Sequence, residues 1–123
     1  MPEMDVRIRA TGFELTTPIN DYAEERLMSI RHLIGADSGA VRCEIELGRS
    51  SGHSKHGNVW FAEINLNAND GSRFFARSEG ESINAAIDAV KDDVLAQMRN
   101  HKKVSRGMLR KGGAYLKRLI QRG

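Results

Sequence analysis

Four segments of the chain alternate between apolar and polar residues, which is the pattern of strands with one buried face. The alternating segments are residues 4–10, 41–47, 58–67 and 72–78. Between the last two lies Asn69-Asp70-Gly71, whose residues tolerate the positive φ of a tight turn. Residues 48–57 are rich in Gly, Ser and His and are predicted to form a loop. The pattern therefore predicts four strands, with a hairpin joining the last two.

Two further segments have the three-and-four spacing of amphipathic helices. The first follows Thr17, a predicted N-cap, starts at Pro18 and stops at Gly35. Its predicted buried positions are Ile19, Tyr22, Ala23, Leu27, Ile30 and Leu33 or Ile34. The second spans residues 79–103, with Ser82 as its N-cap. Its apolar stripe consists of Ile83, Ala86, Ile87, Val90, Val94 and Met98.

The order strand, helix, three strands, helix predicts an α+β fold. A helix between the first two strands permits a parallel crossover, whereas short turns make the later pairs antiparallel. Both helices must bury their stripes, and the sheet offers one apolar face. We expect a two-layer β-α-β-β-β-α sandwich, with a four-stranded mixed sheet and both helices on one face.

Composition restricts the class of protein. The 123 residues fit one domain, and no apolar run approaches the ~18 residues of a membrane span. No secretory signal pattern starts the chain, so we expect a cytoplasmic protein without membrane contact. The single Cys43 lies in an alternating apolar segment, which favours a core thiol over a reactive one.

The net charge of +3 is distributed unevenly along the chain. Eight of the 19 basic residues follow His101, and all 16 acidic residues precede it. An acid-free basic tail is typical of polyanion binding, to nucleic acid first and a membrane surface second. A tail that only aids solubility is the alternative.

We predict an α+β domain at residues 1–103 and a basic tail at residues 104–123. Gly107 and the Gly112-Gly113 pair favour breaks in the tail, and Tyr115, Leu116, Leu119 and Ile120 are spaced for a short helix. The tail is therefore expected to be flexible or briefly helical.

Enzymatic signatures are weak. Cys43, His53 and His56 could offer metal ligands, but their spacing matches no known zinc site. Asp92 and Asp93 are adjacent, so on a helix they diverge and do not form a catalytic pair. There is no glycine-rich phosphate-binding signature. We predict a non-enzyme with no cofactor, no metal and no small-molecule substrate.

The second helix carries a family resemblance. The sequence Ser-Glu-Gly-Glu-Ser-Ile-Asn-Ala-Ala-Ile-Asp at residues 78–88, with Gln97 and His101-Lys102, resembles the bacterial ribosome hibernation-promoting factor and ribosome-associated inhibitor family. The strand from Trp60 to Leu66 adds to the resemblance, which covers residues 4–103. It implies the same strand and helix order, similar to that of double-stranded RNA-binding domains.

The resemblance implies a translation inhibitor that binds small-subunit rRNA during stress or slow growth and occludes the mRNA and tRNA channel. The long form of the family has a separate dimerising domain, which we do not expect here, and the oligomeric state stays open. The predicted RNA-binding residues are Lys55, His56, Lys91, Arg99, His101, Lys102, Lys103, Arg106, Arg110, Lys111, Lys117 and Arg118.

The helix departs from the family pattern at four positions. Asn84 replaces the usual Tyr, and Asp93, Ala96 and Asn100 replace Lys, Arg and Lys. These changes remove positive charge from the helix, so either the tail supplies the missing RNA contacts or the ribosomal binding site differs from that of the family. The alternatives are a protein-interaction module that modulates a nitrogen-type sigma factor, as in the family's older description, and a general RNA-binding protein.

Overall fold

A computed structural model describes residues 4–34, 41–50, 59–68 and 71–110, with side chains as far as His101. The elements are β1 (Met4–Thr11), α1 (Thr17–Ile34), β2 (Val41–Arg49), β3 (Trp60–Ala68), β4 (Arg73–Gly80) and α2 (Ile83–Arg110). The predicted element order is confirmed.

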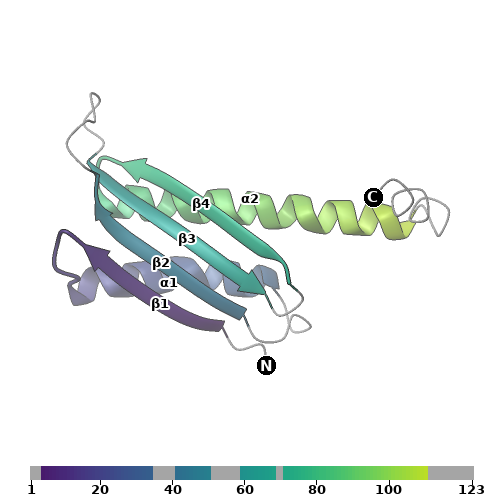
Figure 1. Ribbon diagram of the computed structural model, residues 1–123, viewed down its shortest axis with the longest axis horizontal. Helices are drawn as coiled ribbons and strands as arrows, with labels where there is room; N and C mark the ends of the chain where they lie inside the picture. The colour runs from purple at the N-terminus through teal and green to yellow at the C-terminus, as the bar shows by residue number, and fades with distance from the viewer. Residues whose placement is uncertain (1–3, 35–40, 51–58, 69–70, 111–123) are drawn as a thin grey trace.

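The strands form one sheet in the order β1-β2-β3-β4. β1 pairs with β2 in parallel, and the other two pairs are antiparallel, as predicted. Both helices lie behind the sheet and leave its other face open (Figure 1). The predicted α+β two-layer sandwich is therefore confirmed, because alternation gave the sheet one apolar face for both helices to cover.

The core lies between the sheet and the two helices. Helix α1 contributes Ala23, Leu27 and Ile30 to the core. Helix α2 contributes Ile87, which has no solvent-exposed surface. The other buried α2 side chains include Ala86, Val90, Val94 and Met98, so the predicted stripe is confirmed apart from Ile83, which is partly buried.

The predicted start of α1 and the predicted end of β2 differ from the structure. Helix α1 starts at Thr17, one residue before the predicted start at Pro18. Asn20 N–H donates a 2.9 Å hydrogen bond to the Thr16 carbonyl, so Thr16 and not Thr17 is the residue that precedes the helix. Strand β2 continues through Gly48 and Arg49, where a loop was predicted. Gly48 pairs with Phe61 on β3, and this cross-strand partner extends the strand. Gly35 and the loop residues 51–58 lie outside the described residues.

The β3–β4 hairpin is closed by a 2.8 Å hydrogen bond that Ala68 N–H donates to the Ser72 carbonyl. Gly71 has a φ of 92°, which favours glycine. The turn was predicted here, although Asn69 and Asp70 lie outside the described residues.

The predicted N-cap of α2 is confirmed, since Ser82 Oγ accepts a 3.0 Å hydrogen bond from Ala85 N–H. The predicted helix span began too early, because Glu79 and Gly80 end β4 and α2 starts at Ile83. Gly80 precedes it where a side chain has no room: an added Cβ would lie 2.7 Å from Ala86 N. The helix continues to Arg110, through Gly107, where the sequence favoured a break. The proposed boundary at residue 103 thus falls inside a continuous helix, and the division into domain and tail remains a prediction.

Candidate nucleic-acid interface

The predicted basic residues lie mainly toward one end of α2. Arg99 and His101 are exposed. Lys91 is different, because its side chain is only 18% exposed and its Nζ lies 3.0 Å from Asp92 Oδ1. Lys91 is therefore paired and less accessible to solvent than Arg99.

His101 contacts the sheet just before the last nine residues of α2, residues 102–110. Its ring meets the Phe74 ring edge to face, with centroids 5.6 Å apart. Beyond this contact the helix projects past the sheet (Figure 1). Lys102, Arg106 and Arg110 recur every four residues in the projecting segment, which places them along one side of the helix. Lys103 belongs to the same segment, so α2 carries a run of basic positions away from the core.

The remaining predicted residues lie outside the described residues. These are Lys55 and His56 in the loop, and Lys111, Lys117 and Arg118 in the tail. Their assignment to RNA binding remains a prediction.

The earlier part of α2 is not a positive surface. Asp92, Asp93, Ala96 and Asn100 are all exposed. Gln97 sits among them and has a structural contact, because its Nε2 donates a 2.8 Å hydrogen bond to the Phe75 carbonyl of β4. Gln97 therefore ties α2 to the edge strand, and the basic residues of α2 other than Lys91 lie from Arg99 onward.

A polar cluster joins α1 to α2 and was missed by sequence reasoning, which placed Tyr22 on the buried face only. The Tyr22 hydroxyl donates to both Asp88 carboxylate oxygens, at 2.9 and 2.8 Å. Arg26 Nε donates to Asp88 Oδ1 at 3.0 Å, and its guanidinium lies 4.4 Å from the Tyr22 ring centroid. Hydrogen bonding to Tyr22 and then to Asp88 raises the pKa of Arg26. The cluster fixes how the two helices lie together.

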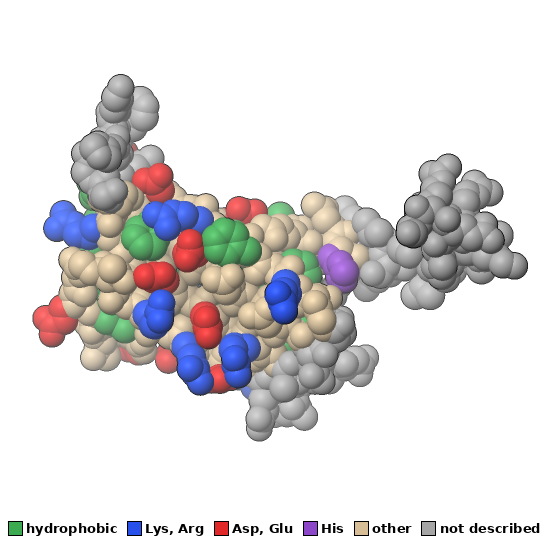
Figure 2. Space-filling view, in the orientation of Figure 1, with side chains coloured by type: hydrophobic (Ala, Val, Ile, Leu, Met, Phe, Trp, Pro, Cys, Tyr) green, Lys and Arg blue, Asp and Glu red, His purple; other side chains and the backbone are tan. Residues whose placement is uncertain are grey.

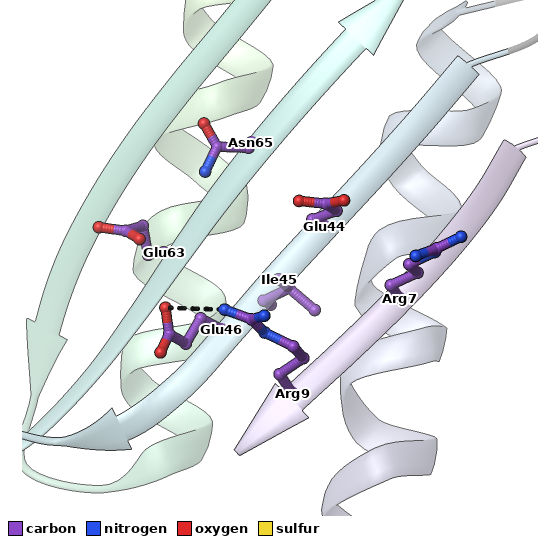
Figure 3. Close-up of a pocket in the computed structure, with 7 residues that line it drawn as sticks. All are labelled: Arg7, Arg9, Glu44, Ile45, Glu46, Glu63 and Asn65. Carbon is purple, nitrogen blue, oxygen red and sulfur yellow. Dashed lines mark ion pairs between the residues drawn. The ribbon is translucent and has the colours of Figure 1, made fainter. Parts of the chain in front are cut away.

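The open sheet face carries mixed charge (Figure 2), and it bears a hollow between β1, β2 and β3 (Figure 3). Arg7 and Arg9 of β1 border the hollow, and Glu44, Glu46 and Glu63 line it from β2 and β3, with the uncharged Asn65 of β3 also in its lining. Arg9 Nη2 lies 3.9 Å from Glu46 Oε2. Because carboxylates outnumber guanidinium groups here, this hollow disfavours a phosphate.

The candidate metal ligands do not come together in the described structure. Cys43 faces the core with no exposed surface, and burial raises its pKa to about 12. His53 and His56 lie outside the described residues. Within the described ranges no three His, Cys, Asp or Glu side chains are grouped to hold a metal ion. No helix in the same ranges is long and apolar enough to cross a membrane.

The chain belongs to the family described as sigma 54 modulation protein / S30EA ribosomal protein, whose model matches residues 6–106. The match confirms the resemblance seen in the second helix and in the strand at Trp60. No curated protein sequence matches the chain.

Two solved structures share the fold. The N-terminal domain of Protein Y from Thermus thermophilus is 21% identical, with a TM-score of 0.65 over 80% of this chain and 99% of that one. A ribosomal subunit interface protein from Coxiella burnetii is 14% identical, with a TM-score of 0.57 over 81% of this chain and 99% of that one.

Proposed function

We propose that this protein is a non-enzymatic ribosome hibernation factor that binds rRNA of the small ribosomal subunit and occludes the mRNA and tRNA channel. The observation that carries the proposal is the family match over residues 6–106. The matched range includes the start of the projecting segment of α2, residues 102–110. Proteins of this fold bear the names ribosomal subunit interface protein and Protein Y.

The charge distribution supports binding by the projecting end. The exposed side of α2 before Arg99 carries Asp92 and Asp93, whereas the chain after His101 contains only basic charged residues. Contacts from Lys and Arg to phosphates give affinity without base specificity. The folded domain then inhibits translation sterically, because a compact domain in the channel excludes tRNA without any chemical step.

Sedimentation with purified ribosomes tests this function. The full chain should co-sediment with the small subunit and lower translation in vitro. Protein that stays at the top of the gradient, with translation unchanged, would contradict the proposal.

A second candidate function is modulation of a nitrogen-type sigma factor, which the family description itself names. The acidic exposed side of α2 would then be the binding surface. Affinity capture from lysate with and without nuclease separates the two: capture that survives nuclease and contains a polymerase subunit favours this alternative, and nuclease-sensitive capture of ribosomal proteins favours ribosome binding.

A further inference from the structure

Phe75 of β4 is an exposed aromatic residue on the open face of the sheet. Its side chain is 52% exposed, although it occupies a strand in a well-packed domain. Strand alternation places Arg73 and Arg77 on the same face, and Asn65 of β3 pairs directly with Phe75. A single exposed apolar residue is common on protein surfaces. Its neighbours, however, are two arginines and an amide.

The Phe75 ring has a free π face. Phe61, on the same sheet face, is covered by Arg77, whose guanidinium lies 4.0 Å from the ring centroid. Phe13 pairs with Trp60, and Phe74 pairs with His101. Within the described residues neither a ring nor a cation stacks on Phe75. A planar ligand can therefore reach this ring without displacing a protein contact.

The backbone holds Phe75 in place. The Gln97 side chain donates to its carbonyl at 2.8 Å, and its pairing with Asn65 joins it to the interior of the sheet. A ring on a rigid strand loses little conformational entropy when a ligand stacks on it. The site is thus preformed.

Positive charge lies at one end of this face. The register aligns Asp5 of β1, Arg42 of β2, Asn67 of β3 and Arg73 of β4 in one row. The Asp5 carboxylate forms its ion pair with Arg7 rather than with Arg42. Arg42 and Arg73 are exposed, and neither has an ion-pair partner among the described residues. At the other end of the face, Arg77 Nη1 lies 3.5 Å from Glu63 Oε1, so the Arg77 guanidinium is already in an ion pair. Guanidinium groups available for phosphate therefore flank Phe75 on one side only.

This row lies close to the point where the projecting segment of α2, residues 102–110, begins. Phe74, between Arg73 and Phe75 in sequence, contacts the His101 ring from the other side of β4. An RNA strand that follows the projecting helix can therefore reach Arg73 around the sheet edge. We propose that Phe75 stacks an unpaired RNA base, that Arg73 and Arg42 bind adjacent phosphates, and that Asn65 and Asn67 contact base edges.

The proposal rests on the proposed function only for the choice of RNA. Aromatic side chains on a four-stranded sheet bind single-stranded bases by stacking, in a sequence-tolerant way. A protein partner fits less well, because the core of a protein interface is depleted of charged residues, and two arginines flank this ring.

Fluorescence anisotropy with a labelled short oligouridine tests the site in the full-length protein. Phe75→Ala should weaken binding roughly 5- to 150-fold, the loss expected for one base–aromatic stack. Phe75→Tyr should bind as the unchanged protein does. An RNA duplex of matched length is the control ligand, since paired bases cannot stack on the ring and the substitution should leave duplex binding unchanged.

Met28→Ala is the matched control variant, because Met28 is 43% exposed on α1, in the other layer. Arg73→Gln should flatten the negative slope of log affinity against log salt by about 0.7, as for one phosphate of a single strand. The proposal is overturned if Phe75→Ala leaves oligouridine binding unchanged. It is also overturned if the substitution weakens duplex binding as much as oligouridine binding. Ribosome sedimentation is scored separately, so loss of the proposed function leaves the oligouridine comparison intact.

Discussion

Gly48 of β2 lies directly opposite Phe61 of β3, and the Phe61 ring covers the glycine. A Cβ added at Gly48 would lie 2.5 Å from Phe61 Cε1 and 3.0 Å from the Thr11 carbonyl oxygen. Phe61 is consequently only 8% exposed on the otherwise open sheet face. The missing side chain of one strand makes room for the ring of the next.

Gly48→Ala should destabilise the protein by about 1–3 kcal/mol, the usual cost of overpacking. Urea denaturation measures the loss. The same change made in a Phe61→Ala background should cost less, with a coupling of about 0.5–3 kcal/mol, because the ring that clashes is gone. Equal costs in both backgrounds would assign the crowding to Thr11 instead.

Ile87 is fully buried between α2 and the sheet. Ile87→Ala should lower the free energy of unfolding by about 2–5 kcal/mol, and Ile87→Val by about 0.5–1.5 kcal/mol, in proportion to the cavity left. Denaturant unfolding of both variants provides the comparison. A change below about 0.5 kcal/mol for Ile87→Ala would be far smaller than this range and would mean that a different side of the helix faces the sheet.

Cys43 should couple folding to pH at the alkaline end. Its pKa is raised from 9.0 to about 12 in the folded state, so between these values the unfolded chain binds fewer protons than the folded one. Stability from this group is present below pH 9.0 and is lost as pH rises toward 12.

Unfolding free energies of the unchanged protein and of Cys43→Ala, measured over this pH range, isolate the contribution of the thiol. The unchanged protein should lose more stability with rising pH than the variant. Parallel curves would contradict the raised pKa. In the native state the thiol should also resist alkylation, because it has no exposed surface.

Asp93 is exposed on α2, where the family usually has a basic residue. Asp93→Lys should leave folding within about 0.5 kcal/mol, as expected for a surface change. If this side of α2 meets phosphate, the variant should bind ribosomes more tightly in a sedimentation titration. Glu24→Lys on α1 makes the same charge change at an exposed site of the other helix. Equal tightening by both variants would indicate a net-charge effect rather than a contact at Asp93.

Truncation tests the basic end. A chain ending at Val104 loses Arg106, Arg110 and four further basic residues, whereas one ending at Arg110 keeps all of α2. Each lost phosphate contact flattens the slope of log affinity against log salt by about 0.7–0.9. If about four contacts are lost, the shorter chain should flatten it by about three units, and the longer one by less.

Folding should be preserved in both truncated chains, because the last core residue described in α2 is Met98. Circular dichroism and urea unfolding check this point. Identical salt slopes for all three chains would mean that the tail makes no phosphate contact and that Arg99 and the loop at Lys55 carry the binding.

The elements of this fold could be predicted from the sequence because each is governed by a local period. Alternation at Val41, Cys43 and Ile45 marks β2, and the spacing of Ile87, Val90 and Val94 marks the buried side of α2. The cap at Ser82 is equally local. With one apolar sheet face and two amphipathic helices, a two-layer sandwich follows from burial alone.

The site depends on contacts that no local period encodes. Phe61 follows the alternation that exposes it, yet it is buried because register places it over Gly48 and because Arg77 covers its ring. The Asp88 carboxylate meets Tyr22 only because α1 and α2 pack side by side. Phe75 and Arg42 share a face through the pairing of three strands, although 33 positions separate them in the numbering. Cross-strand register and helix packing are long-range properties, so the tertiary structure alone decided which rings are covered and which charges stand beside them.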